Sequence, residues 1–95
     1  MLFMVIEPFR KRDPKPIYRR LRDQVRQMPD GLKYLDSWIE HTFERCFQLV
    51  ESDDARLLQQ WIVHWSELTE FEIVPVVPSS DTREIVAPIS IVRRL

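Results

Sequence analysis

Arg45-Cys46-Phe47-Gln48-Leu49-Val50-Glu51 is a short, mostly apolar stretch between two charged residues. A run of this length, bounded by polar and turn-forming residues, is typical of a strand inside a sheet. The residues before it, 41–44, suit a hairpin connection, and Ser52-Asp53-Asp54 after it suit the start of a helix. The stretch therefore predicts an inner strand between a hairpin and a helix.

Upstream of this strand, the sequence predicts a strand, a helix and a second strand. Leu2 to Phe9 is rich in β-branched and aromatic residues, which favours a strand. Asp13-Pro14 is typical of a helix N-cap followed by proline in the first turn. Leu32 to Glu40 alternates well enough for a strand after the turn at residues 29–31. Apolar residues recur at helical spacing between them: Ile17, Tyr18, Leu21, Val25 and Met28.

Downstream, the sequence predicts one more helix, one more strand and a tail. Phe71 to Val77 is a strand candidate whose Pro75 favours an edge position. Asp81-Thr82-Arg83-Glu84 has the spacing of a capping box, so we expect a short helix there and an extended segment after it. A wide apolar helix face is formed by Ala55, Leu58, Trp61, Ile62, Trp65 and Leu68.

The resulting order, β-α-β-β-α-β, predicts an α+β ferredoxin-like plait. Right-handed crossovers place the strands at 2–9 and 45–51 in the middle of a four-stranded antiparallel sheet, with both helices on one face. We expect a single domain over residues 1–95, with the plait at 1–78 and a short helix and tail at 79–95.

Composition narrows the possible functions. The 95 residues contain one glycine, which argues against phosphate-cradling loops. One cysteine and two widely spaced histidines argue against a metal site, and no cofactor signature is present. The single cysteine fits a reducing compartment, so we expect a cytoplasmic protein. The longest apolar run, residues 1–6, is too short to span a membrane.

Charge is unevenly distributed along the chain. Residues 10–26 hold eight basic and two acidic side chains, and residues 27–72 hold three basic and ten acidic ones. Lys15, Arg19, Arg22 and Arg26 share one flank of the first predicted helix. This stripe lacks the interleaved aromatic residues that bind bases, so a solvated flank is a simpler interpretation than a nucleic-acid site.

Alternation along the strands divides their side chains into two sets. We expect the purely apolar set to face the helices: Leu2, Met4, Ile6, Leu35, Ile39, Phe47, Leu49, Phe71 and Ile73. We expect the mixed set to lie on the open face: Phe3, Val5, Glu7, Tyr34, Asp36, Trp38, Glu40, Cys46, Gln48, Val50, Glu72, Val74 and Val76. The open face would then expose more apolar surface than a small monomer tolerates, which predicts a homodimer.

Several segments resemble a small bacterial family, family 3303 of the domains of unknown function. They are residues 2–7, 31–34, 37–38, 45–51, 61–65 and 71–76. The resemblance implies a dimeric α+β barrel, in which two ferredoxin-like sheets close around a central space. That wider group includes cofactor-free monooxygenases, small-lactone isomerases, haem-degrading enzymes and members without known activity. The family has no established reaction, so the resemblance assigns no catalytic residue.

Six polar or aromatic side chains would line a cavity in the space between the two sheets: Glu7, Tyr34, Asp36, Trp38, Cys46 and Gln48. Tyr34, Trp38, Cys46 and Gln48 are the candidate ligand-binding residues, with Trp38 as an aromatic wall. Glu7 is the candidate general base, since apolar surroundings would raise its pKa. Alternatively, Glu7 pairs with a basic residue of the partner chain. A buried structural role is also the simpler interpretation of Cys46, because His41 lies across a turn and no orienting acid is evident.

Three functions remain open from the sequence. The first is an uncharacterised homodimeric barrel that binds a small apolar organic ligand between its sheets. The second is a non-catalytic homodimeric module whose interface is fully packed. The third is an enzyme similar to the cofactor-free monooxygenases or isomerases. An empty pocket beside Glu7, Trp38 and Gln48 would favour the first function, and a packed interface there would favour the second.

Overall fold

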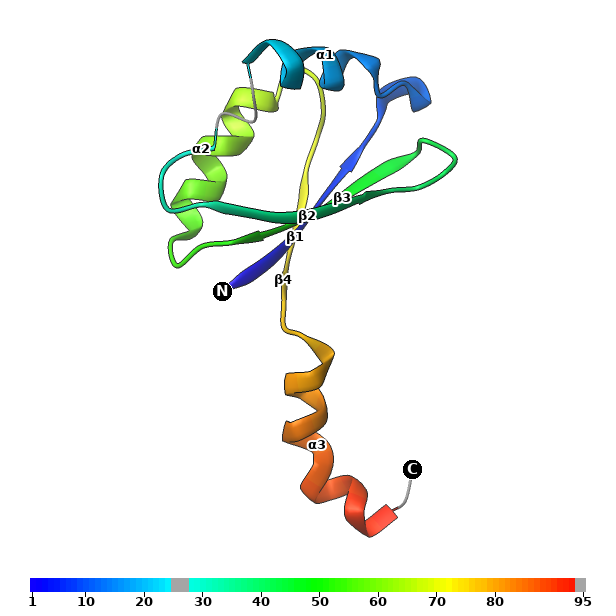
Figure 1. Ribbon diagram of the computed structural model, residues 1–95, viewed down its shortest axis with the longest axis vertical. Coiled ribbons are helices and arrows are strands. Elements are labelled where there is room, and N and C mark those ends of the chain that lie inside the picture. Colours follow the sequence, from blue (N-terminus) through cyan, green and yellow to red (C-terminus); the bar gives the residue numbers. More distant parts are fainter. Residues whose placement is uncertain (25–27, 94–95) are drawn as a thin grey trace.

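The computed structural model describes residues 1–24 and 28–93, and the side chains of residues 1–22 and 28–88. The chain forms four strands and three α-helices, with a short 3-10 helix at Arg10–Arg12 (Figure 1). The strands are β1 (Leu2–Pro8), β2 (Lys33–Ile39), β3 (Arg45–Glu51) and β4 (Glu72–Val76). The α-helices are α1 (Lys15–Gln24), α2 (Ala55–Trp65) and α3 (Ser79–Arg93).

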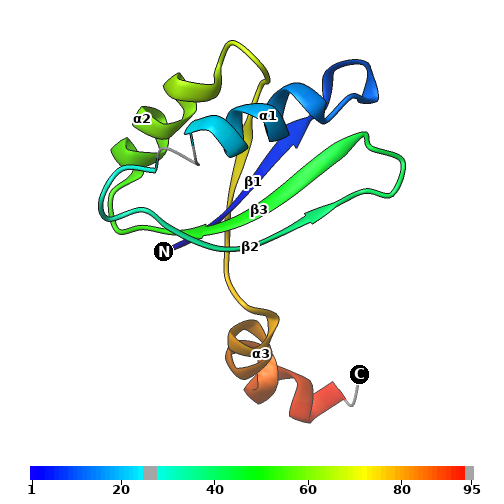
Figure 2. The same cartoon turned by 45° about the horizontal axis from the view of Figure 1, so that its top comes forward.

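The strands form one antiparallel sheet in the order β2-β3-β1-β4. β3 and β1 lie in the middle, and α1 and α2 lie on the same side of the sheet (Figures 1 and 2). The predicted α+β ferredoxin-like plait is therefore confirmed, and the stretch at 45–51 is an inner strand.

Aspartate side chains cap the N-termini of both helices of the plait, as the sequence predicted. The backbone N–H of Lys15 donates to Asp13 Oδ1 over 3.0 Å at the start of α1. The N–H of Arg56 donates to Asp54 Oδ1, also over 3.0 Å, at the start of α2. Such bonds satisfy donors that have no partner within the helix. The predicted extension of α1 to Met28 passes through residues 25–27, which lie outside the described residues, and Met28 itself is not helical.

The expected assignment of faces is wrong for the two central strands. Phe3, Val5 and Glu7 of β1 are buried, while Leu2, Met4 and Ile6 are half-buried. In β3, likewise, the mixed set Cys46, Gln48 and Val50 is buried, and Phe47 and Leu49 are half-buried. The mixed sets therefore face the helices, and the apolar sets lie on the open face.

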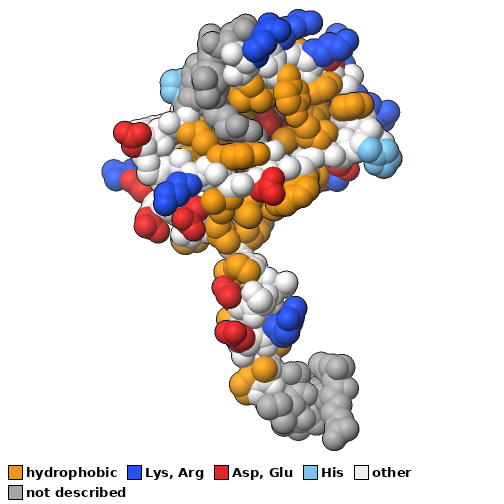
Figure 3. Space-filling model, in the orientation of Figure 1, with side chains coloured by type: hydrophobic (Ala, Val, Ile, Leu, Met, Phe, Trp, Pro, Cys, Tyr) orange, Lys and Arg blue, Asp and Glu red, His pale blue; other side chains and the backbone are white. Residues whose placement is uncertain are grey.

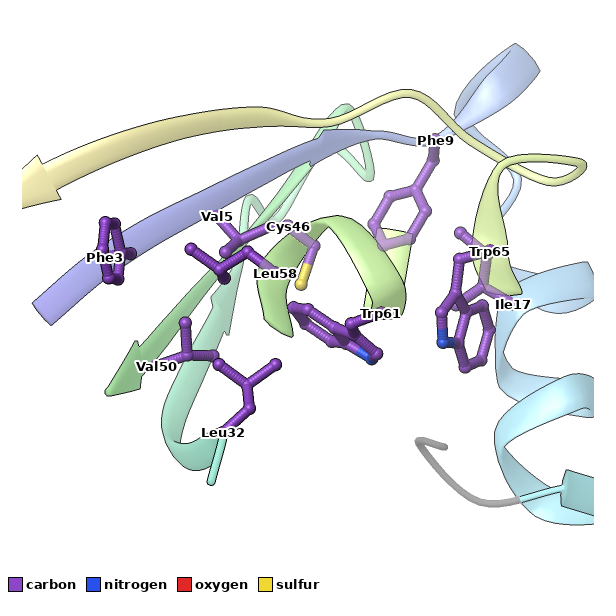
Figure 4. Close-up of a cluster of buried hydrophobic side chains, with 10 residues drawn as sticks. All are labelled: Phe3, Val5, Phe9, Ile17, Leu32, Cys46, Val50, Leu58, Trp61 and Trp65. Atoms are coloured by element: carbon purple, nitrogen blue, oxygen red, sulfur yellow. The ribbon is translucent and has the colours of Figure 1, made fainter. Parts of the chain in front are cut away.

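Packing volume explains this reversal. Trp61 and Trp65 of α2 are both buried and fill much of the space between the helices and the sheet (Figure 4). On the same face of the sheet, the small side chain of Cys46 lies next to Trp61 (Figure 4), and Val5 and Val50 are completely buried. Interiors are close-packed, so two indole rings are better accommodated opposite small side chains than opposite another layer of large ones.

The edge strands follow the prediction in part. In β4, Ile73 lies opposite Val5 on the helix side, and Val74 lies opposite Met4 on the open side, as expected. In β2, a bulge between Tyr34 and Asp36 shifts the register. Because of this bulge, Tyr34 lies opposite buried Val50, on the helix side and not on the open face as predicted.

The C-terminal segment also differs from the expectation. It is one helix from Ser79 to Arg93 that contains Pro88, and not a short helix followed by an extended tail. Figures 1 and 2 show that α3 extends away from the plait on the side opposite α1 and α2. No helix among the described residues has the length and apolar character needed to cross a membrane.

Candidate ligand-binding site

A hollow lies between the helices and the sheet on the closed side of the plait. Figure 3 shows apolar side chains around it and acidic atoms within it. Its lining residues are Glu7, Phe9, Ile17, Tyr18, Leu21, Ser37, Cys46, Gln48, Trp61, Trp65 and Phe71. We call this space the helix–sheet hollow.

The polar floor of the hollow comes from the two central strands. In the β1–β3 ladder, Glu7 lies directly opposite Cys46, and Gln48 lies opposite Val5. Glu7 and Gln48 are therefore diagonal neighbours on one face, within reach of long side chains. Gln48 Nε2 donates a hydrogen bond to Glu7 Oε1 over 2.6 Å. This bond holds one carboxyl oxygen at a defined position in the floor.

Burial makes this polar pair energetically significant. Glu7 is 4% exposed and Gln48 is 9% exposed. A polar group that leaves water without a hydrogen-bond partner costs about 1–3 kcal/mol, and a carboxylate costs more. The Gln48 amide offsets part of that cost. A carboxylate also accepts several hydrogen bonds, so Glu7 is a suitable acceptor for a ligand N–H or O–H.

The walls of the hollow are largely aromatic. Trp61 and Trp65 are one helical turn apart on α2, and Phe71 precedes β4. The Trp61 and Phe71 ring centroids are 6.2 Å apart, with an interplanar angle of 38°. Such rings provide flat apolar contact surface for an organic molecule. Sequence reasoning placed both tryptophans in the core but not at the site, although their i, i+4 spacing directs them to the same face.

Cys46 contributes a thiol to the hollow. The side chain is buried, and Figure 4 shows its sulfur directed toward Trp61. His41, the candidate base for this thiol, lies in the exposed β2–β3 turn and does not line the hollow. The arrangement supports the structural interpretation of Cys46, with the thiol as part of the apolar wall.

The structure separates the remaining two candidate residues. Tyr34 donates to or accepts from Ser37 Oγ over 2.6 Å, and Ser37 lines the hollow. Tyr34 is therefore one hydrogen bond away from the lining. Trp38 lies opposite Phe47 on the open face and is 50% exposed. It does not belong to the same site as Glu7, Cys46 and Gln48.

The helix–sheet hollow is small. Its cavity volume is about 40 Å³. A single water molecule needs at least about 10–15 Å³ on this measure. This volume holds roughly three water molecules, so a larger organic ligand would have to widen the hollow.

Other parts of the chain offer less for binding. In the described residues, no three His, Cys, Asp or Glu side chains form a group that could hold a metal ion. Lys15, Arg19 and Arg22 of the basic stripe are exposed, and Arg26 lies outside the described residues. They do not line the helix–sheet hollow.

A family model described as "Domain of unknown function (DUF3303)" matches residues 1–90. The chain belongs to this family. No curated protein and no solved structure matches it. The family description states no activity.

Proposed function

We propose that this DUF3303 protein binds a small, largely apolar organic molecule in the helix–sheet hollow. The hydrogen-bonded pair of Glu7 and Gln48 beneath aromatic walls carries the proposal. Ligand sites typically combine apolar walls with a few convergent polar groups. The site differs from the space between two sheets expected from the sequence, because the candidate polar residues face α1 and α2.

The chemistry of the floor specifies the kind of ligand. Its apolar body would contact Trp61, Trp65 and Phe71, and an N–H or O–H group would donate to Glu7. A ligand proton held against Glu7 is also in the position from which a general base removes it. The proposed function is therefore ligand binding. If the site is also catalytic, its geometry favours proton transfer to Glu7.

A thermal-shift screen of small aromatic and lactone-like compounds tests this proposal. A compound present at 100 times its Kd adds about 2.7 kcal/mol to the stability of the folded state. We expect at least one compound to raise the Tm of the wild-type protein by several degrees. We expect Glu7→Gln to weaken its binding at least about tenfold, because loss of one charge-assisted hydrogen bond costs about 1.5–3 kcal/mol.

Trp38→Phe is the matched control for this screen, since Trp38 is on the opposite face of the sheet. It should leave the ligand-induced shift unchanged. A shift that depends on Trp38 but not on Glu7 would place the ligand on the open face instead. If no compound stabilises the protein, the alternative of a non-catalytic module gains support.

We also propose that the protein is a homodimer that associates through its open sheet face. This face is defined by eight apolar residues: Leu2, Met4, Ile6, Trp38, Phe47, Leu49, Val74 and Val76. The register of the strands places them together, and none of them is fully buried. A continuous apolar face of this kind on a small domain is typical of an interaction surface. Sheet-to-sheet association, as in the dimeric α+β barrels, would cover it.

A further inference from the structure

The described side chains of helix α3, at residues 79–88, have little contact with the rest of their own chain. The molecule measures 54 × 32 × 17 Å, and Figure 1 shows α3 projecting along the longest direction. Of residues 79–88, all are exposed except half-buried Ala87. Two apolar residues in this segment, Ile85 and Val86, are 72% and 42% exposed. The side chains described in α3 therefore leave apolar surface uncovered.

A helix in this situation needs a packing partner. Isolated helices shorter than about 12–15 residues are marginal in water, and most helical stability in proteins comes from tertiary contacts. α3 has 15 residues and contains Pro88, and an interior proline costs about 3 kcal/mol relative to alanine. The propensity of the sequence alone does not account for a stable α3, which points to a contact beyond its own chain.

The position of α3 identifies the second copy as that partner. α3 projects on the side of the sheet opposite α1 and α2, which is the side of the open sheet face (Figures 1 and 2). A shallow apolar groove joins this face to the base of α3. The residues that line it are Met1, Leu2, Pro75, Val76, Val77, Pro78 and Asp81. The proposed dimer surface is thus continuous with the start of α3.

The length of α3 also fits this partner. Fifteen residues of α-helix span roughly 22 Å at 1.5 Å per residue. Two sheets that pack face to face are about 10 Å apart. A helix that starts at the edge of one sheet and runs along this direction therefore extends past the layer of the second sheet. Any copy seated on the open sheet face lies beside it.

We infer that α3 is a clasp that packs the Ile85–Val86 surface of each copy against the other copy of the homodimer. Two-fold symmetry makes the contact reciprocal, so each dimer has two clasps. This inference rests on the proposed homodimer and adds the segment that holds its two copies together. It does not depend on ligand binding in the helix–sheet hollow.

Sedimentation velocity over a concentration series tests the clasp with full-length variants. Ile85→Glu should raise the Kd of the dimer at least about tenfold, since burial of an isoleucine contributes roughly 1.5–3 kcal/mol. Glutamate has a helix propensity at least as high as that of isoleucine, so the substitution should not destabilise α3 itself. Val63→Glu on α2 is the matched control, because Val63 is 70% exposed and lies on the far side of the plait. It should leave the Kd unchanged.

The outcomes separate the clasp from the proposed dimer. A wild-type protein that is monomeric at all concentrations overturns both proposals. A wild-type dimer that Met4→Glu dissociates but Ile85→Glu does not overturns the clasp and leaves the sheet-face dimer standing. Equal weakening by Ile85→Glu and Val63→Glu would also overturn the clasp, because the effect would then be one of added charge.

Hydrogen exchange provides a second readout that does not need a variant. The amides of α3 should become at least about tenfold better protected as the protein passes from monomer to dimer, since contact with the second copy stabilises the helix. Protection that is independent of protein concentration would mean that α3 packs on its own chain. That result overturns the clasp even if the protein is a dimer.

Discussion

Glu40 and Arg45 form an ion pair where β2 turns into β3. Arg45 Nε donates to Glu40 Oε1 over 2.6 Å, and a second guanidinium nitrogen donates to Oε2 over 3.2 Å. The hydrogen bond from Arg45 is the main reason that the pKa of Glu40 is lowered below its ordinary value. The sequence predicted the turn between Glu40 and Arg45 but not their ion pair. A separation of five residues does not reveal the direction or the rotamer of either side chain.

Replacing Arg45 tests this pair directly. We expect Arg45→Met to return the pKa of Glu40 toward its ordinary value, as measured by NMR titration of the Glu40 carboxyl group. Because the folded-state pKa is the lower one, the pair's stabilisation is present above the unfolded-state pKa and is lost as the pH falls through the folded-state pKa. The two proteins should therefore converge in stability on the acid side of that window.

Asp54 serves as the internal control in the same titration. Its pKa is lowered by Arg56 and not by Arg45, so it should be the same in both proteins. An unchanged Glu40 titration in the variant would show that the pair does not persist in solution.

At the scale of elements, the segment between α2 and β4 is attached to the end of β1. Thr69 is 1% exposed, and its hydroxyl donates to the carbonyl oxygen of Pro8 over 2.8 Å. Nearby, Arg10 donates to the carbonyl oxygen of Glu67 over 2.9 Å. These bonds connect segments that are 61 and 57 residues apart in the sequence. They position Phe9 and Phe71, which line the helix–sheet hollow.

Thr69→Val removes the hydroxyl donor while nearly conserving shape. We expect it to lower the free energy of unfolding by about 0.5–1.5 kcal/mol, because the part-buried hydrogen bond to the Pro8 carbonyl is lost. The measurement is the midpoint of urea unfolding at fixed protein concentration, with an unchanged m-value. Thr42→Val in the exposed β2–β3 turn is the control and should stay within about 0.5 kcal/mol of wild type. Equal effects of the two changes would contradict a specific role for Thr69.

The boundaries of the helices and strands show which features can be predicted from residues that are neighbours in the chain. The caps at Asp13 and Asp54 were predictable because capping uses residues adjacent in the chain. The β2 bulge was not, since it depends on pairing with β3. The single helix through Pro88 was also missed, because proline normally predicts the end of a helix.

At the scale of the whole molecule, the plait has one covered and one open sheet face. The covered face meets Trp61 and Trp65, and the open face displays an apolar surface continuous with α3. A small domain with this arrangement gains stability when a second copy covers the open face. The proposed function therefore has two separate locations: the hollow within each copy and the interface between copies.

A concentration series of thermal unfolding tests this view of the molecule. If folding and association are coupled, each tenfold increase in protein concentration adds about 1.4 kcal/mol to the stability of the dimer. We expect the wild-type Tm to rise by a few degrees for each such increase. Met4→Glu on the open sheet face should remove this dependence. A wild-type Tm that is constant over a hundredfold range would contradict the dimer.

The sequence by itself determined the order of strands and helices, the plait topology and the grouping of Glu7, Cys46 and Gln48. These follow from local periodicity, because alternate residues on adjacent strands necessarily share a face. Which face they share was decided only by the tertiary structure. Both sets of side chains are apolar enough to be buried, and the choice depends on the volume that Trp61 and Trp65 occupy above the sheet. For the same reason the strand at 45–51 presents Cys46, Gln48 and Val50 to the helices, and Phe47 and Leu49 to the open face.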